Sequence, residues 1–292
     1  MNTSDTIKTD RKQHWIRPAL GALAAIATTA AVTFSGLSAT FNALSLIPLM
    51  ALFWFLERLS RAEMGFIWGK VRHYGLALLY PVFALGTAAL AAWMGGAINL
   101  GNMDWSKTAL NAAVLVLAST LIGLITEEGF FRGWLWSALK RSGQSPYWTI
   151  VWTSLAFAAW HLPIALLDTG FSLAPAQVPV YIFNVVIAGG VILGFMRLIS
   201  GSVIVASVSH GIWNGVGYTF FGSGSTIGAL GIQDTATYGP EVGVVGVVLN
   251  AVFAIGVWLW YRGKEMAAAA NQGMQLTPGV QSHLDDIPVS RS

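Results

Sequence analysis

Two adjacent carboxylates and an arginine lie inside an apolar stretch of the chain, in the segment TEEGFFRGW at residues 126–134. Glu128 and Arg132 are four residues apart, so on a helix they share a face and can pair, either to support a site or to clamp neighbouring helices. On the same helix Glu127 is offset by about 100°, and the spacing gives it no such partner. Because an unpaired carboxylate within a membrane span marks a candidate functional site, Glu127 is the first candidate.

Two further apolar stretches carry polar side chains that could complete a site. SLAFAAWHLP contains Phe157 and His161, and SVSHGIWNG contains His210 and Asn214, which are also four residues apart on one helical face. At 1.5 Å per residue, Glu127, His161 and Asn214 each lie roughly 18 to 21 Å from the cytoplasmic end of their helix. We expect these side chains to meet at one depth, with His210 one turn lower and Phe157 in the pocket wall.

These residue types fit the hydrolysis of an acyl bond. Glu127 can act as a general base toward water, while His161 orients the water or shares its proton. His210 and Asn214 can donate hydrogen bonds to the oxygen on which negative charge develops in the transition state. The pattern therefore predicts a hydrolytic site within the membrane, with the Glu/Arg pair in support.

The elements that must position these groups are membrane-spanning helices. Of 292 residues 55% are hydrophobic and only 10% are charged, and the mean hydropathy is +0.62. Soluble domains carry roughly 25% charged residues, so composition predicts an all-α, polytopic membrane helix bundle. Apolar stretches of about 20 residues predict eight spans, and the site lies in the core formed by the fourth, fifth and seventh. The spans run approximately over residues 18–36, 40–56, 75–97, 112–138, 147–166, 177–196, 202–221 and 242–261.

The charges between the spans predict the topology. With a cytoplasmic N-terminus, almost every Lys and Arg falls in an inside segment, and only Lys107 falls outside. The outer loops carry acidic residues instead, among them Glu241. We expect a cytoplasmic tail over residues 1–17, one transmembrane domain over 18–262 and a polar, disordered tail over 263–292. Both termini are then cytoplasmic, and a prokaryotic plasma membrane is the expected location.

The three motifs together resemble a known family. EExxxR from residue 127, FxxxH from residue 157 and HxxxN from residue 210 occur in the order typical of the CPBP family of intramembrane proteases, also called the CAAX-protease or Abi family. The resemblance covers roughly residues 112–221. It implies that Glu127 and His161 activate water, that His210 and Asn214 stabilise the oxyanion, and that the second glutamate and the arginine support the site.

Other readings of the same residues stay open. Glu127, Glu128, His161 and His210 could instead ligate zinc, although the helical HExxH pattern is absent. A non-catalytic scaffold or a transporter could also contain intramembrane charge. The expected partners are the lipid bilayer and a membrane-associated protein or peptide substrate, with no nucleic acid and no cofactor. The chain has no cysteine, which excludes disulfides and a cysteine nucleophile.

Overall fold

The computed structural model describes residues 3–275, with gaps at 38, 102, 169, 170, 172 and 225. Within the chain, contacts define two compact units, Met1–Ala254 and Ile255–Ser292. Most of the described residues are helical, and the only strands among them are the short antiparallel pair β1 (Gly222–Ser223) and β2 (Thr226–Ile227) in a loop. The all-α prediction is therefore confirmed.

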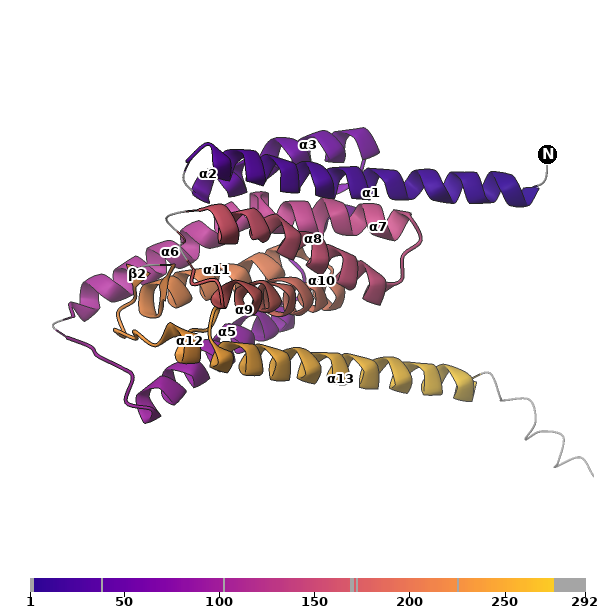
Figure 1. Ribbon diagram of the computed structural model, residues 1–292. Helices are drawn as coiled ribbons and strands as arrows, with labels where there is room; N and C mark the ends of the chain where they lie inside the picture. The colour runs from indigo at the N-terminus through magenta and orange to yellow at the C-terminus, as the bar shows by residue number, and fades with distance from the viewer. Residues whose placement is uncertain are drawn as a thin grey trace, which may run out of the picture. The chain divides into compact units, whose positions relative to one another are not determined.

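In the described part of the chain, seven helical stretches are long and apolar enough to cross a membrane (Figure 1). They match seven of the eight predicted spans, and three of them are built from two or more consecutive elements. The elements are α1 (Thr3–Phe34), α2 (Ala39–Leu44) with α3 (Leu46–Glu57), α5 (Val71–Met94), α6 (Trp105–Ile125) with η1 (Glu128–Leu135) and α7 (Trp136–Arg141), α8 (Pro146–Leu167), α9 (Gln177–Asn184) with η2 (Val185–Ile192) and α10 (Leu193–Ser200), and α13 (Val244–Gln275).

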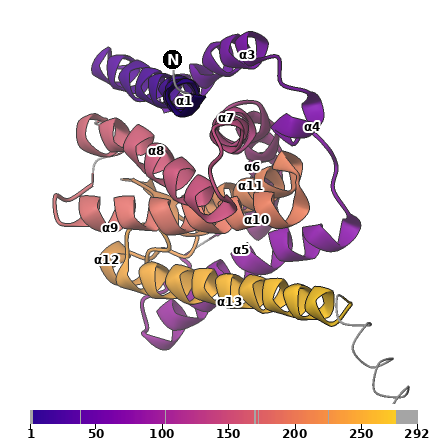
Figure 2. The ribbon, with the colours of Figure 1, turned by 90° about the vertical axis from the view of Figure 1, so that its right-hand side faces the viewer.

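The remaining predicted span, 202–221, corresponds to α11 (Val203–Phe220), which is helical but is not among the seven. Its serines, glycines, histidine and asparagine make it less apolar than the others. This composition fits its place, because α11 packs against α6, α5, α10 and η1 and lies between α6 and α10 (Figure 2). A helix that contacts protein on several sides can carry polar groups that a lipid-facing helix cannot.

Glycines allow α11 to approach α6 closely. A Cβ atom at Gly211 would overlap the Thr120 side chain, and one at Gly215 would overlap the backbone of Val116. Small residues at such positions are a common means of helix packing within membranes. Ser202 fixes the start of α11, because its hydroxyl accepts hydrogen bonds from the backbone N–H groups of Ile204 and Val205.

The fourth and sixth spans are not continuous α-helices. In the fourth, α6 ends at Ile125, Thr126 has the non-helical backbone angles φ −116° and ψ −99°, and the π-helix η1 begins at Glu128. In the sixth, the π-helix η2 separates α9 from α10. A π-helix has a wider turn than an α-helix and is frequent at functional sites.

Helices extend into both predicted tails where the structure describes them. α1 begins at Thr3, so the described part of the N-terminal tail is helical. At the other end α13 continues to Gln275, so the predicted disorder from residue 263 is wrong as far as 275, because an alanine run at residues 267–270 extends the helix. Residues 276–292 lie outside the described residues. Within the second unit, Lys264 Nζ lies 3.9 Å from the ring centre of Trp260.

Two short helices complete the first unit. α4 (Arg61–Met64) begins with a capping box, in which Ser60 and Glu63 bind each other's backbone N–H groups. α12 (Thr235–Tyr238) is capped by Asp234, whose carboxylate accepts from Thr237 N–H. The first lies between the second and third spans, and the second lies in the long connection between α11 and α13.

Candidate functional site

A charged cluster at the start of η1 forms one part of the site. Glu128 Oε1 accepts a hydrogen bond from Arg132 Nη1 at 3.1 Å and another from His210 Nδ1 at 2.9 Å. The side chains of Glu128 and Arg132 are fully buried. The predicted Glu128–Arg132 pair is therefore confirmed, and His210 from α11 is a third member of it.

The break at Thr126 changes the position expected for Glu127. Glu127 Oε2 lies 3.9 Å from His210 Nε2, so one imidazole faces both glutamates. The spacing predicted that Glu127 lacks the arginine partner of Glu128, and its neighbour in the structure is His210 from α11 rather than a residue of its own helix. Glu127 Oε2 is buried and makes no hydrogen bond to any described residue. An oxygen atom bound between Glu127 and His210 could contact both side chains.

His161 is held by the turn of α8 that precedes it. Its Nδ1 lies 2.9 Å from the Phe157 carbonyl oxygen. A carbonyl can only accept, so Nδ1 carries the proton in this bond, and Nε2 of the neutral ring has a free lone pair. The ring of His161 contacts those of Phe157, Trp160 and Tyr181 at centroid distances of 4.5, 4.7 and 6.2 Å. These contacts fix the orientation of the imidazole.

Phe157 connects the charged cluster to His161. Its buried ring lies 4.2 Å from the guanidinium carbon of Arg132, a cation–π distance, while its carbonyl binds His161. The prediction that Phe157 forms part of the pocket wall is confirmed. Arg132 is held on its backbone as well, because its carbonyl accepts from Arg197 Nε at 3.0 Å.

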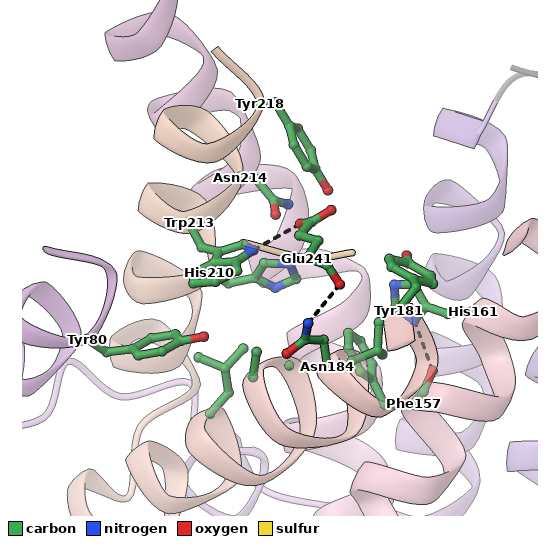
Figure 3. A pocket seen from close by; sticks show the side chains of 14 residues that line it. Tyr80, Phe157, His161, Tyr181, Asn184, His210, Trp213, Asn214, Tyr218 and Glu241 are labelled. Atoms are coloured by element: carbon green, nitrogen blue, oxygen red, sulfur yellow. Dashed lines mark hydrogen bonds between the residues drawn. The ribbon is translucent and has the colours of Figure 1, made fainter. Parts of the chain in front are cut away.

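A pocket of about 510 Å³ brings the other predicted residues together (Figure 3). Phe157, His161, His210 and Asn214 all line it. Asn184 and Glu241 complete its polar lining, and aromatic rings form much of the remaining wall. The fifth and seventh predicted spans therefore line one pocket, whereas Glu127 and Glu128 of the fourth span do not line it and contact it through His210.

The sequence reading missed a carboxylate in this pocket. Glu241, which was expected only as an acidic loop residue, lines the pocket, and its Oε1 accepts a hydrogen bond from Trp213 Nε1 at 2.9 Å. The Glu241 backbone carbonyl accepts from Asn184 Nδ2 at 2.8 Å. Since helical periodicity does not place a residue in a 23-residue connection between helices, no pattern in the sequence pointed to Glu241.

A chain of buried polar side chains extends from Asn184. Asn250 Nδ2 donates to Asn184 Oδ1 at 3.0 Å, and Tyr80 Oη donates to Asn250 Oδ1 at 3.0 Å. Asn184 and Asn250 are amides within largely apolar spans, and such residues commonly join membrane helices. That signal was available in the sequence and could have identified both residues.

The described residues contain no group of three or more His, Cys, Asp or Glu side chains arranged to hold a metal ion. The four residues considered as zinc ligands take part in different contacts. Glu128 and His210 bind each other, whereas His161 Nδ1 binds a backbone carbonyl.

Comparison with known proteins identifies the region that contains the site. Residues 109–216 match the family model described as "Rce1-like: Type II CAAX prenyl endopeptidase Rce1-like". This region includes all seven predicted site residues. Comparison with curated proteins and with solved structures gives no match. With seven candidate membrane spans in the described chain, the protein is a multi-pass membrane protein. Residues 109–216 are therefore similar to the CAAX-protease, or CPBP, family.

Proposed function

We propose that this protein is an intramembrane endopeptidase that hydrolyses a peptide bond with water activated by Glu127 and His161. The observation that carries the proposal is the position of His210, whose Nδ1 binds Glu128 while its Nε2 lies 3.9 Å from Glu127. One imidazole thus links a structural carboxylate to a carboxylate that has an unpaired oxygen. Such an arrangement fits a site in which Glu127 takes up and releases a proton during the reaction.

The reaction follows from the roles of these side chains. Glu127 accepts a proton from water, and the lone pair of His161 Nε2 orients that water toward the substrate. The hydroxide oxygen adds to the carbonyl carbon, and the proton then passes to the departing nitrogen as the C–N bond breaks. The products are a carboxylic acid and an amine.

The developing oxyanion needs hydrogen-bond donors. Asn214 offers its side-chain N–H, and His210 offers Nε2–H when its ring is protonated. Glu128 favours that protonated state because it accepts from Nδ1, and Arg132 in turn holds Glu128. No metal or other cofactor takes part in the proposed reaction.

The substrate of the proposed enzyme is a membrane-associated protein or peptide. The family description refers to prenyl endopeptidases, so a prenylated peptide is the first probe to use. We further propose that the protein lies in the plasma membrane of a prokaryote with both termini in the cytoplasm, because the basic residues gather on the predicted inner segments.

The test uses purified protein in liposomes with an internally quenched peptide, in farnesylated and unmodified forms. We expect Glu127→Gln and His161→Ala each to lower kcat/KM by about 10²–10⁴-fold, and Asn214→Ala to lower kcat by about 10²–10³-fold. Glu63→Gln removes an exposed carboxylate in α4 and serves as the control.

Near-normal turnover in Glu127→Gln, with the unfolding midpoint unchanged, would exclude Glu127 as the base. Activity that is lost on chelation and restored by zinc would favour a metalloprotease instead. If no peptide is cleaved and the Glu127→Gln protein keeps its cellular role, a non-catalytic scaffold is favoured.

A further inference from the structure

The carboxylate of Glu241 lies in the same pocket as His161, His210 and Asn214 and has no role in the proposed hydrolysis. Figure 3 shows its side chain between α11, which carries Trp213 and Asn214, and α9, which carries Asn184. Glu241 belongs to the connection before α13, more than 100 residues after η1 in the sequence.

Glu241 is held in place at two points. Trp213 Nε1 binds one carboxylate oxygen, and Asn184 Nδ2 binds the backbone carbonyl of the same residue. The polar chain through Asn250 to Tyr80 fixes Asn184 in turn. A loop residue with this many fixed contacts is preorganised, so little conformational entropy would be lost when a ligand binds to it.

One oxygen of Glu241 is available to a ligand. Oε1 accepts from Trp213, whereas Oε2 makes no hydrogen bond to a described residue and is not among the fully buried polar atoms. Burial raises the pKa of Glu241, against the opposing effects of Trp213 and His210. A carboxylate in such surroundings is stabilised in its charged form by a cation.

The residues around Glu241 favour a positively charged ligand over an anionic or an apolar one. Among the described residues that line the pocket His210 is basic and none is lysine or arginine, while the rings of Tyr181, Trp213 and Tyr218 form part of the wall. Aromatic faces attract ammonium and guanidinium groups. The combination of one carboxylate with several aromatic rings is selective for a basic side chain.

Glu241 also borders a second pocket. A neighbouring space of about 510 Å³ is lined by residues of α12, the β1–β2 loop and the start of α9, and it shares Tyr218 and Glu241 with the first pocket. Gln177 and Thr235, which lie 3.3 Å apart through Gln177 Nε2 and Thr235 Oγ1, form part of its polar wall. A peptide that extends from the first pocket into the second would pass Glu241.

We propose that Glu241 is a substrate-recognition residue, which binds a lysine or arginine side chain of the peptide close to the bond that is cut. This inference rests on the proposed peptidase function and specifies its substrate as a peptide with a basic residue near the cleavage site. Trp213 and Asn184 act as positioning residues for Glu241.

The test compares peptides that differ in one charge. Each internally quenched peptide carries a single lysine at one of several positions on either side of the cleaved bond, and its partner carries norleucine there, which has the same chain without the charge. We expect the wild-type protein to cleave the lysine peptide about tenfold better at one position or more. In Glu241→Gln the kcat/KM value for the lysine peptide divided by that for the norleucine peptide should fall to about one.

Asp234→Asn serves as the control, and Glu241→Lys serves as the counter-test. Asp234→Asn removes the same charge from the same connection, lines neither pocket, and preserves a good helix cap, so the lysine preference should remain. Glu241→Lys should reverse the preference toward a peptide with glutamate at that position. Glu241→Gln keeps an oxygen that can accept from Trp213, so its unfolding midpoint should stay close to wild type.

A binding measurement separates this inference from the proposed catalysis. Fluorescent lysine and norleucine peptides are titrated into Glu127→Gln and into Glu127→Gln/Glu241→Gln, neither of which needs to cleave. The recognition role is supported if Glu127→Gln binds the lysine peptide about tenfold more tightly than the norleucine peptide and the double variant does not. This result would support it even if the wild type cleaves neither peptide. Equal binding of the two peptides by both proteins, at every lysine position, would overturn it.

Discussion

The two π-helical segments, η1 and η2, use the same backbone irregularity for different purposes. All eight residues of η1 are buried, and they include Glu128 and Arg132. η2, with the sequence VVIAGGVI, has no charged residue and has glycines at 189 and 190. One segment places charge inside the protein, and the other allows a neighbouring helix to approach.

Both segments meet at Phe157. The Arg132 guanidinium of η1 lies over its ring, and a Cβ atom at Gly189 of η2 would overlap that ring. Because Phe157 also binds His161, the orientation of the imidazole depends on both segments. In this protein the charged residues of η1 and the closely packed, apolar η2 thus hold Phe157 between them.

Removal of the buried arginine should have the largest effect on stability. Arg132→Ala leaves Glu128 with His210 as its only partner, and we expect a loss of about 3 kcal/mol in the free energy of unfolding, measured in mixed detergent micelles. Arg141→Ala removes an arginine from an exposed pair with Glu63 and should change stability by less than about 1 kcal/mol. Equal effects of the two substitutions would contradict the view that η1 depends on its internal charges.

Addition of a methyl group at Gly190 of η2 should have an intermediate effect on stability. In Gly190→Ala the new Cβ would lie 2.5 Å from Ser154 Cβ on α8, so the two helices must move apart, at a cost of about 1–3 kcal/mol. Gly86→Ala in α5, where nothing lies within 4 Å of the new Cβ, is the matched control. Unfolding midpoints of the two variants would be compared. A midpoint in Gly190→Ala as high as in the control would mean that η2 does not require close approach.

The smallest effect on stability is expected for Glu63 in α4, which lies outside the membrane spans. The backbone N–H of Ser60 and the guanidinium of Arg141 lower the pKa of Glu63 from 4.5 to about 2. A lowered pKa in the folded state means that this contribution to stability is complete above about pH 4.5 and is lost as the pH falls toward 2. The unfolding midpoint of the wild type should therefore decrease in this window by more than that of Glu63→Gln. Parallel pH profiles of the two proteins would exclude the contribution.

The spans and the Glu128–Arg132 pair could be predicted because hydrophobic length and the four-residue spacing depend only on local geometry. The meeting of the fourth and seventh spans at His210 was also expected, since their polar residues lie at one depth. The break at Thr126 could not be predicted, because no proline lies near it and the preceding glycine, Gly123, lies within the regular helix α6. Glu241 could not be placed because it belongs to a loop, whose path depends on tertiary contacts rather than on periodicity.

The extra width of η1 has a geometric consequence for the residues before it. A π-helical turn contains about one residue more than an α-helical turn, so residues upstream are rotated by about 100° relative to a regular helix. If the segment 128–135 kept its eight residues but became α-helical, Glu127 and the end of α6 would turn by roughly that angle relative to α7. The direction in which Glu127 faces is thus determined by the length of the following segment as much as by its own position in the chain.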